Sequence, residues 1–130
     1  MNGFTVMLHS LEGVLDTFDE HVVPKLEELR TQVIHNDLNP GNILIDKSSR
    51  CNISGIIDFG DLVKSPLIIE LAVAAAYQLG DHDDPLAGAL PMIAGYHSIL
   101  PLKTDEIEVL GIMIRTRLVT SLLIGSYRAE

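Results

Sequence analysis

Apolar and polar positions along the chain predict a helix, a polar loop, a two-stranded hairpin and then a series of helices. From about Leu15 to Arg30, apolar residues recur among charged ones at the spacing of one helix face. These apolar positions are Phe18, Val22, Leu26 and Leu29. Pro24 lies inside this window, so we expect the helix to break there or to start there. Residues 1–12 show no clear pattern.

Two short runs rich in β-branched residues predict the hairpin. Ile43–Ile45 and Ile53–Ile57 are separated by the polar stretch 46–52, which has the composition of a turn. Before them, Val33 and Ile34 lead into a polar loop that runs from His35 to Gly41.

The second half of the chain has the pattern of helices throughout. Ser65 followed by Pro66 predicts a helix start, because a capping hydroxyl often precedes a proline in the first turn. Gly80 predicts the end of that helix. Asp84 with Pro85 predicts the start of another helix.

Further along, Pro91 must kink or restart that helix before Tyr96. Thr104 is expected to cap the last helix. The predicted apolar stripe of that helix is Ile107, Leu110, Ile114, Leu118 and Leu122. The whole pattern therefore predicts an α+β fold that is mostly α.

Composition narrows the class of protein. The chain has 130 residues, enough for one domain but short for an enzyme that holds two substrates. Apolar residues make up 47% of it and the mean hydropathy is +0.28, so we expect some apolar surface to be covered by another part or partner. The net charge of −9 argues against nucleic acid or an anionic membrane as a partner.

Location follows from what the sequence lacks. Cys51 is the single cysteine, so no internal disulfide can form and a reducing compartment is expected. We see no signal peptide and no apolar run long enough to span a membrane, and we therefore expect a cytoplasmic protein.

Candidate chemistry is concentrated at one end of the predicted hairpin. Asn42 begins the first strand and Asp58 ends the second, so two oxygen ligands 16 positions apart meet there. Asp37 lies in the loop just before the first strand. Phosphoryl transfer needs a carboxylate to deprotonate the attacking hydroxyl and oxygen ligands for Mg²⁺, and this arrangement offers both.

The same residues carry a resemblance to a known family. The loop fits the pattern H-x-D-x-x-x-x-N, and Asp58-Phe59-Gly60 fits the pattern D-F-G. With Glu70-Leu71-Ala72 and Ala76-Tyr77, these motifs make the chain similar to the aminoglycoside phosphotransferase family, over roughly residues 15–128. The hydroxylysine-kinase branch of that family is the most similar, and its modules also occur fused to class III aminotransferases.

The resemblance implies a fold, a reaction and site residues. The fold is the C-terminal lobe of a protein-kinase-like enzyme, with a catalytic-loop β-hairpin and a helical remainder. The reaction is ATP-dependent phosphorylation of a hydroxyl on a small, amino-containing, hydroxylysine-like metabolite. The implied residues are Asp37 as catalytic base, Asn42 and Asp58 as ligands of the Mg²⁺ that accompanies ATP, and Asn39 as a contact to the transferred phosphate.

Four further side chains have plainer interpretations. His35 is expected to pack and to form hydrogen bonds rather than to act in catalysis. Asp61 is either a further acid of the site or a cap for the next turn, and we favour the cap. Arg115 and Arg117 are both interpreted as partners for nearby carboxylates. An alternative is a metal hydrolase whose site is built from His35, Asp37, Asp58 and Asp61. No H-x-H or H-E-x-x-H spacing supports it.

One part of the family pattern has no counterpart here. Residues 1–30 contain no glycine-rich loop and no strand lysine of the kind that holds ATP in a kinase N-terminal lobe. We therefore expect residues 1–130 to be a partial phosphotransferase domain without its ATP-gripping lobe. The expected partners are ATP, a small-molecule substrate, and either fused domains or a second copy bound through exposed apolar surface. The alternative function is a catalytically inactive fragment or interaction module of a larger protein.

Overall fold

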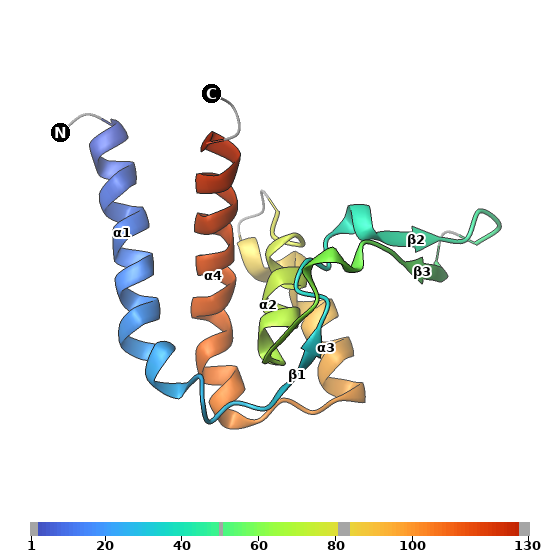
Figure 1. The fold of residues 1–130 in the computed structure, drawn as a ribbon. Coiled ribbons are helices and arrows are strands. Elements are labelled where there is room, and N and C mark those ends of the chain that lie inside the picture. Colours follow the sequence, from blue (N-terminus) through green and yellow to red (C-terminus); the bar gives the residue numbers. More distant parts are fainter. Residues whose placement is uncertain (1–2, 50, 81–83, 128–130) are drawn as a thin grey trace.

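The computed structural model describes residues 3–49, 51–80 and 84–127, and it is mostly helical with two small antiparallel sheets (Figure 1). The α-helices are α1 (Gly3–His21), α2 (Ile68–Ala76), α3 (Leu90–Ile99) and α4 (Thr104–Tyr127). The strands are β1 (Thr31–Ile34), β2 (Ile43–Ile45), β3 (Ile53–Ile56) and β4 (Val63–Pro66). Short 3₁₀ turns are η1 (Val23–Lys25), η2 (Pro40–Asn42), η3 (Phe59–Asp61) and η4 (Pro85–Gly88). The predicted α+β, mostly α fold is confirmed.

The first helix is longer than its sequence pattern indicated. It begins at Gly3, so the absence of a pattern in residues 1–12 did not mark an end. It stops at His21, and Pro24 lies in the following 3₁₀ turn, which confirms the expected break. Phe18 packs against the core cluster, and Val22, just past the end of the helix, is fully buried in it.

The predicted hairpin is formed by β2 and β3, with Ile43 opposite Ile56. Figure 1 shows that it projects away from the helices, and several of its apolar side chains are exposed. The second sheet, β1 paired with β4, was not predicted. Its pairing places Thr31 opposite Pro66, so Ser65 and Pro66 end a strand and the helix start predicted there is wrong. Helix α2 begins at Ile68 instead, because cross-strand bonding holds the preceding residues extended.

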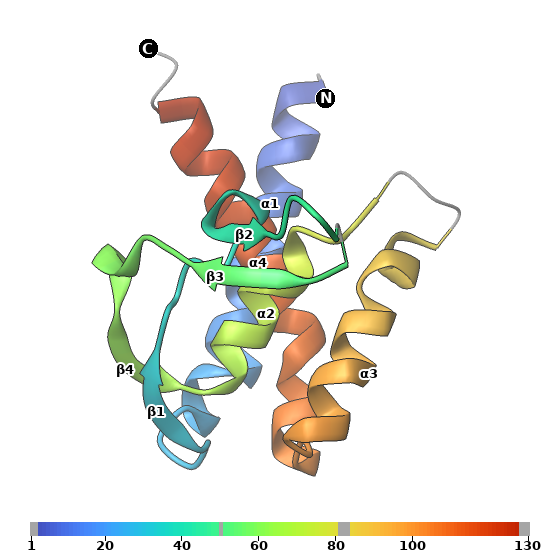
Figure 2. The ribbon, with the colours of Figure 1, turned by 90° about the vertical axis from the view of Figure 1, so that its right-hand side faces the viewer.

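The core lies where α4 packs against both α1 and α2. In Figures 1 and 2, α1 and α4 stand side by side, and α2 lies between them and the strands. Helix α2 is buried over nearly all of its surface, and its short alanine side chains allow neighbouring elements to approach closely. No helix in the described ranges is both long and apolar enough to cross a membrane.

The apolar stripe predicted on α4 is only partly right. Leu110 and Ile114 are buried, but Ile107 and Leu122 are exposed. The buried face is centred roughly a quarter turn away and includes Glu106. Carboxylates are rarely buried without a partner, so the sequence pattern excluded this position from the core.

Arg30 is the ion-pair partner that offsets the cost of burying the Glu106 carboxylate. Its Nε donates to Oε1 at 2.8 Å and its Nη2 to Oε2 at 2.6 Å, a two-pronged ion pair. The backbone N–H of Lys103 donates to the same Oε2 at 2.8 Å. The hydrogen bond from Arg30 holds the pKa of Glu106 below its ordinary value.

Candidate active site

The polar loop between β1 and β2 meets the segment after β3 at the inner end of the hairpin. The N–H of Ile57 donates to the carbonyl oxygen of Asn42 at 3.0 Å, which extends the strand pairing by one position. His35 Nε2 bonds to the carbonyl oxygen of Ile57 at 2.8 Å. These two contacts bring the loop that carries Asp37 and Asn42 next to the segment that carries Asp58, as the hairpin argument predicted.

His35 serves as a structural support for this junction. Its side chain is buried and its ring lies 5.1 Å from that of Phe59, centroid to centroid. A carbonyl oxygen can only accept, so Nε2 carries the proton and Nδ1 is free to accept from the N–H of Asp37 at 3.4 Å. This packing and bonding agrees with the interpretation made from the sequence.

Glu70, at the start of α2, holds the loop from the other side. Its Oε2 accepts the backbone N–H of His35 at 2.5 Å and that of Asn36 at 3.2 Å. Asn36 has φ of 66°, a left-handed conformation that costs energy in residues other than glycine. One carboxylate oxygen thus fixes the strained backbone directly before Asp37.

The Asp37 side chain is held by both neighbouring amides and by a distant arginine. Asn39 Nδ2 donates to its Oδ2 at 3.0 Å, and Asn42 Nδ2 lies 3.4 Å from the same oxygen. Arg117 Nη2 donates to Oδ1 at 2.8 Å. The carboxylate is 26% exposed, so it can still be reached from solvent.

Asn42 and Asp58 differ in how they are held. Asn42 is buried, and its amide nitrogen points to Asp37, which leaves the amide oxygen for another partner. Asp58 is exposed in a left-handed conformation with φ of 64°, and within the described ranges its carboxylate makes no hydrogen bond or ion pair.

The donor chemistry of this pair fits Mg²⁺. One amide oxygen and one unengaged carboxylate are hard ligands, of the kind and number that Mg²⁺ uses when phosphates and water complete its shell. Among the described residues no cluster of three or more His, Cys, Asp or Glu side chains could hold a metal ion. Two protein oxygen ligands leave the other positions of a Mg²⁺ shell to phosphate oxygens and water.

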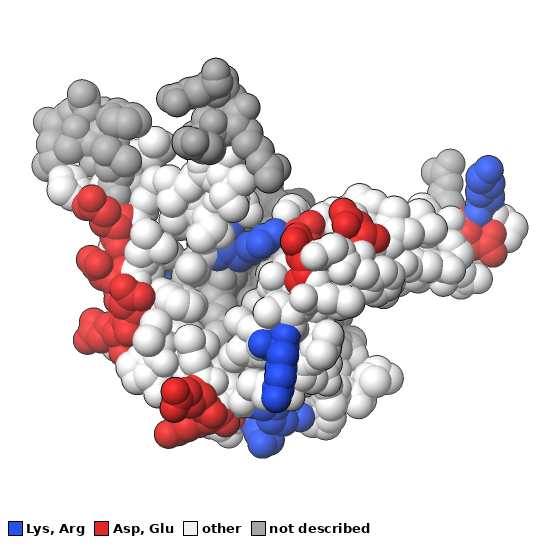
Figure 3. Space-filling view, in the orientation of Figure 1, with Lys and Arg blue, Asp and Glu red and all other residues white. Residues whose placement is uncertain are grey.

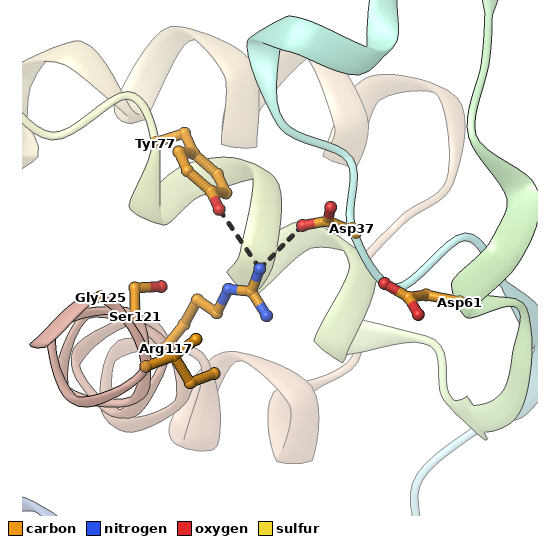
Figure 4. A pocket seen from close by; sticks show the side chains of 7 residues that line it. Asp37, Asp61, Tyr77, Arg117, Ser121 and Gly125 are labelled. Atoms are coloured by element: carbon orange, nitrogen blue, oxygen red, sulfur yellow. Dashed lines mark hydrogen bonds and ion pairs between the residues drawn. The ribbon is translucent and has the colours of Figure 1, made fainter. Parts of the chain in front are cut away.

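A cleft of about 340 Å³ opens beside Asp37 (Figure 4). Its lining residues are Asp37, Asp61, Tyr77, Arg117, Ser121, Ile124 and Gly125. Asp61 does not cap the next turn, because within the described chain its carboxylate makes no hydrogen bond. It lines the cleft instead, so the capping interpretation is wrong.

Three residues around Asp37 were not assigned to the site from the sequence. Glu70 and Tyr77 formed part of the family resemblance only, and the Tyr77 hydroxyl lies 3.3 Å from Arg117 Nη2. Arg117 was interpreted as pairing with some carboxylate, and the structure identifies that carboxylate as Asp37. The two are 80 positions apart, so no local pattern could have joined them.

Comparisons with known proteins agree with this geometry. The profile of the phosphotransferase enzyme family matches residues 6–106. The chain is 32% identical over 127 residues to a hydroxylysine kinase of Xenopus laevis, covering 92% of this chain and 34% of the relative. A hydroxylysine kinase of Danio rerio is 34% identical over 90% of this chain and 34% of its own length. A homoserine kinase of Paramagnetospirillum magneticum is 30% identical over 93% of this chain and 38% of its own. The chain spans about a third of the length of the curated relatives it matches.

Proposed function

Because the chain belongs to the phosphotransferase enzyme (APH) family, we propose that it carries the catalytic centre of an ATP-dependent small-molecule kinase. The membership, together with the hydroxylysine kinases among its relatives, confirms the resemblance drawn from the loop and D-F-G motifs. The observation that carries the proposal is the arrangement of Asp37, held by three side chains, beside the Asn42 and Asp58 oxygen ligands at one end of a hairpin.

In the proposed reaction Asp37 is the base. An acceptor hydroxyl donates its proton to the carboxylate, and the hydroxyl oxygen bonds to the γ-phosphorus of ATP. The bond from that phosphorus to the bridging oxygen of ADP breaks, and ADP leaves with the electron pair. Mg²⁺ bound through Asn42 and Asp58 would neutralise charge on the β- and γ-phosphates.

The side-chain amide of Asn39 already forms hydrogen bonds through both its oxygen and its nitrogen. Its Oδ1 accepts the N–H of Gly41 at 2.8 Å, and its Nδ2 holds Asp37. We keep the prediction that Asn39 contacts the transferred phosphate. To do so, its Nδ2 must turn one of its two N–H bonds from the carbonyl oxygen of Asp37, 3.3 Å away, to a phosphate oxygen.

The acceptor is proposed from the relatives. Hydroxylysine and homoserine, after which these kinases are named, are both amino acids with a side-chain hydroxyl. We propose an acceptor of this class, a small amino-containing metabolite that resembles hydroxylysine.

We further propose that residues 1–130 are part of a larger phosphotransferase domain, whose remaining part grips ATP. The one-third coverage of the relatives supports this. The hairpin also exposes Leu44, Ile45, Ile53, Ile56 and Phe59, which a neighbouring part, a fused domain or a second copy would shield from water. The same exposed surface supports the alternative in which this chain is an inactive interaction module.

The test is transfer of phosphate from ATP to hydroxylysine by the full-length protein that contains this chain. Asp37→Asn is expected to lower kcat by about 10²- to 10⁴-fold, as removal of a general base does. Asp58→Asn should weaken Mg²⁺-dependent ATP binding, and chelation of Mg²⁺ should stop turnover. Asp46→Asn is the matched control, because among the described residues the Asp46 carboxylate bonds only to Ser48, at the far end of the hairpin. Unchanged turnover in Asp37→Asn would refute the assignment, and no turnover in the wild type would favour the inactive module.

A further inference from the structure

The cleft beside Asp37 has charges of both signs. Figure 3 shows acidic and basic side chains meeting in the hollow between α4 and the hairpin. The cleft is lined by two carboxylates, Asp37 and Asp61, by one guanidinium, Arg117, and by the hydroxyl groups of Tyr77 and Ser121. A volume of about 340 Å³ lies at the lower end of the range for small-molecule sites. Such a lining suits a small zwitterion better than an apolar or a purely cationic molecule.

Arg117 is held in place but uses few of its donors. Figure 4 shows its guanidinium reaching between Tyr77 and Asp37. Both hydrogen bonds come from Nη2, one to Asp37 at 2.8 Å and one to the Tyr77 hydroxyl at 3.3 Å. The guanidinium carbon also lies 5.8 Å from the centre of the Tyr77 ring, within cation–π range.

The remaining donors of Arg117 have no partner within the described chain. Nε is buried without a hydrogen bond, and Nη1 makes none. Guanidinium groups are normally satisfied by two-pronged bonds to carboxylates or phosphates. Arg30 shows what this chain does with a purely structural arginine, since both prongs of its bond engage Glu106.

We propose that Arg117 binds the carboxylate of the acceptor, so that the enzyme selects hydroxylated amino acids over the corresponding amino alcohols. This inference rests on the proposed phosphotransferase function and assigns the acceptor side of the same site. The acceptor carboxylate takes the unused donors of Arg117, its hydroxyl faces Asp37, and Asp61 supplies a negative charge for its ammonium group.

Binding at Arg117 also affects the proposed base. Without acceptor, Arg117 Nη2 engages Asp37 Oδ1, one of the two oxygens that could receive a proton. An acceptor carboxylate competes for the charge of this guanidinium, because both carboxylates are anions and Asp37 and Arg117 line the same cleft. A carboxylate bound to the unused donors shares the positive charge of Arg117, so an amino acid weakens the ion pair at Asp37 Oδ1, whereas an amino alcohol leaves it unchanged.

The experiment compares two ligands that differ only in the carboxylate, 5-hydroxylysine and 1,5-diaminopentan-2-ol. Dissociation constants are measured by calorimetry on the full-length protein without ATP, and kcat/KM is measured separately with ATP. The wild type is expected to prefer hydroxylysine by about 10- to 100-fold, the range for a charge-assisted hydrogen bond. Arg117→Met should bind both ligands alike. Arg115→Met is the matched control and should keep the preference, since the Arg115 side chain is exposed and, within the part of the chain that the structure describes, bonds only to the carbonyl oxygen of Gly111.

Each outcome supports or overturns the assignment of Arg117 as the site for the acceptor carboxylate. Equal affinity of the wild type for both ligands overturns the inference without any variant, so poor folding of Arg117→Met cannot hide a failure. A preference that survives in Arg117→Met overturns it as well. Phosphorylation of both ligands at equal rates leaves the kinase proposal standing and removes the role of Arg117. Carboxylate-dependent binding that Arg117→Met abolishes, without any phosphoryl transfer, supports Arg117 and refutes the kinase.

Discussion

Replacing Glu70 tests whether the loop that carries Asp37 is held by a single carboxylate. Glu70 lies in the first turn of α2, and its Oε2 is the acceptor for two consecutive backbone N–H groups, those of His35 and Asn36. Glu70→Ala removes the acceptor from both. Glu70→Gln keeps one acceptor oxygen of the same shape but removes the charge.

The magnitude follows from the two hydrogen bonds. A bond to a charged acceptor contributes about 1.5–3 kcal/mol, and a neutral one about 0.5–1.5 kcal/mol. We take the low end, because the other oxygen, Oε1, is buried without a partner among the described residues and its desolvation opposes the gain. Glu70→Ala should therefore lower the free energy of opening the loop by about 3 kcal/mol, and Glu70→Gln, which exchanges two charged bonds for two neutral ones, by about 2 kcal/mol. The strained φ of Asn36 adds to the tendency to open.

Amide hydrogen exchange measures this opening residue by residue. About 3 kcal/mol corresponds to about 150-fold faster exchange of the His35 and Asn36 amides in Glu70→Ala, and about 2 kcal/mol to about 30-fold in Glu70→Gln. The amide of Ala75, fully buried in α2, is the internal reference for global unfolding. Glu108→Gln is the control variant, since it removes only the surface ion pair with Lys25. Wild-type exchange at both loop amides in Glu70→Ala would refute the reasoning.

Two further predictions concern stability. Arg30 lowers the pKa of Glu106, so the unfolded state binds a proton more readily; the resulting stability is present above the ordinary value of 4.5 and is lost as pH falls through the lowered pKa. Urea unfolding between about pH 3 and pH 7 should therefore show that Glu106→Gln loses less unfolding free energy on acidification than the wild type does. The same pH dependence of the unfolding free energy in both proteins would contradict the pairing. A Cβ added at Gly88 would lie 2.1 Å from the carbonyl oxygen of Gln78, so Gly88→Ala should cost about 1–3 kcal/mol of unfolding free energy. Gly95→Ala, with nothing within 4 Å in α3, should instead be neutral or stabilise by up to about 1 kcal/mol, and a loss there would count against the contact argument.

The hairpin end could be predicted because its determinants are local. Two β-branched runs and the turn between them specify the pairing, and that pairing alone brings Asn42 near Asp58. The family pattern then added a role for each residue. The second sheet was missed because β1 and β4 are about thirty positions apart and Pro66, a helix-start signal by itself, sits at the end of the pairing.

The parts of the site that depend on helix packing could not be predicted in the same way. Whether Arg117 faces the cleft depends on the rotation of α4 about its axis. That rotation is set partly by the buried pair of Glu106 with Arg30, a contact between residues 76 positions apart. The buried face that hydrophobicity alone predicts for α4 lies roughly a quarter turn from the observed one. A helix packed on that predicted face would have Arg117 turned away from the core side.

These contacts hold Asp37 in position before substrates bind, whereas they do not hold the side chain of Asp58. Asp37 is held by side chains from its own loop and from α4, and the backbone of the two residues before it is held by Glu70 from α2, so both helices determine its position. Asp58 lies at the inner end of the hairpin with an exposed side chain, and within the described chain it is positioned only by its backbone. Preorganisation matters most for the group that meets the reacting hydroxyl, because misplacement of a base by about 1 Å can cost 10²-fold in rate. Asp58, the proposed metal ligand, can be drawn into place by the cation and its phosphates, so the proposed site needs to fix only Asp37 in advance.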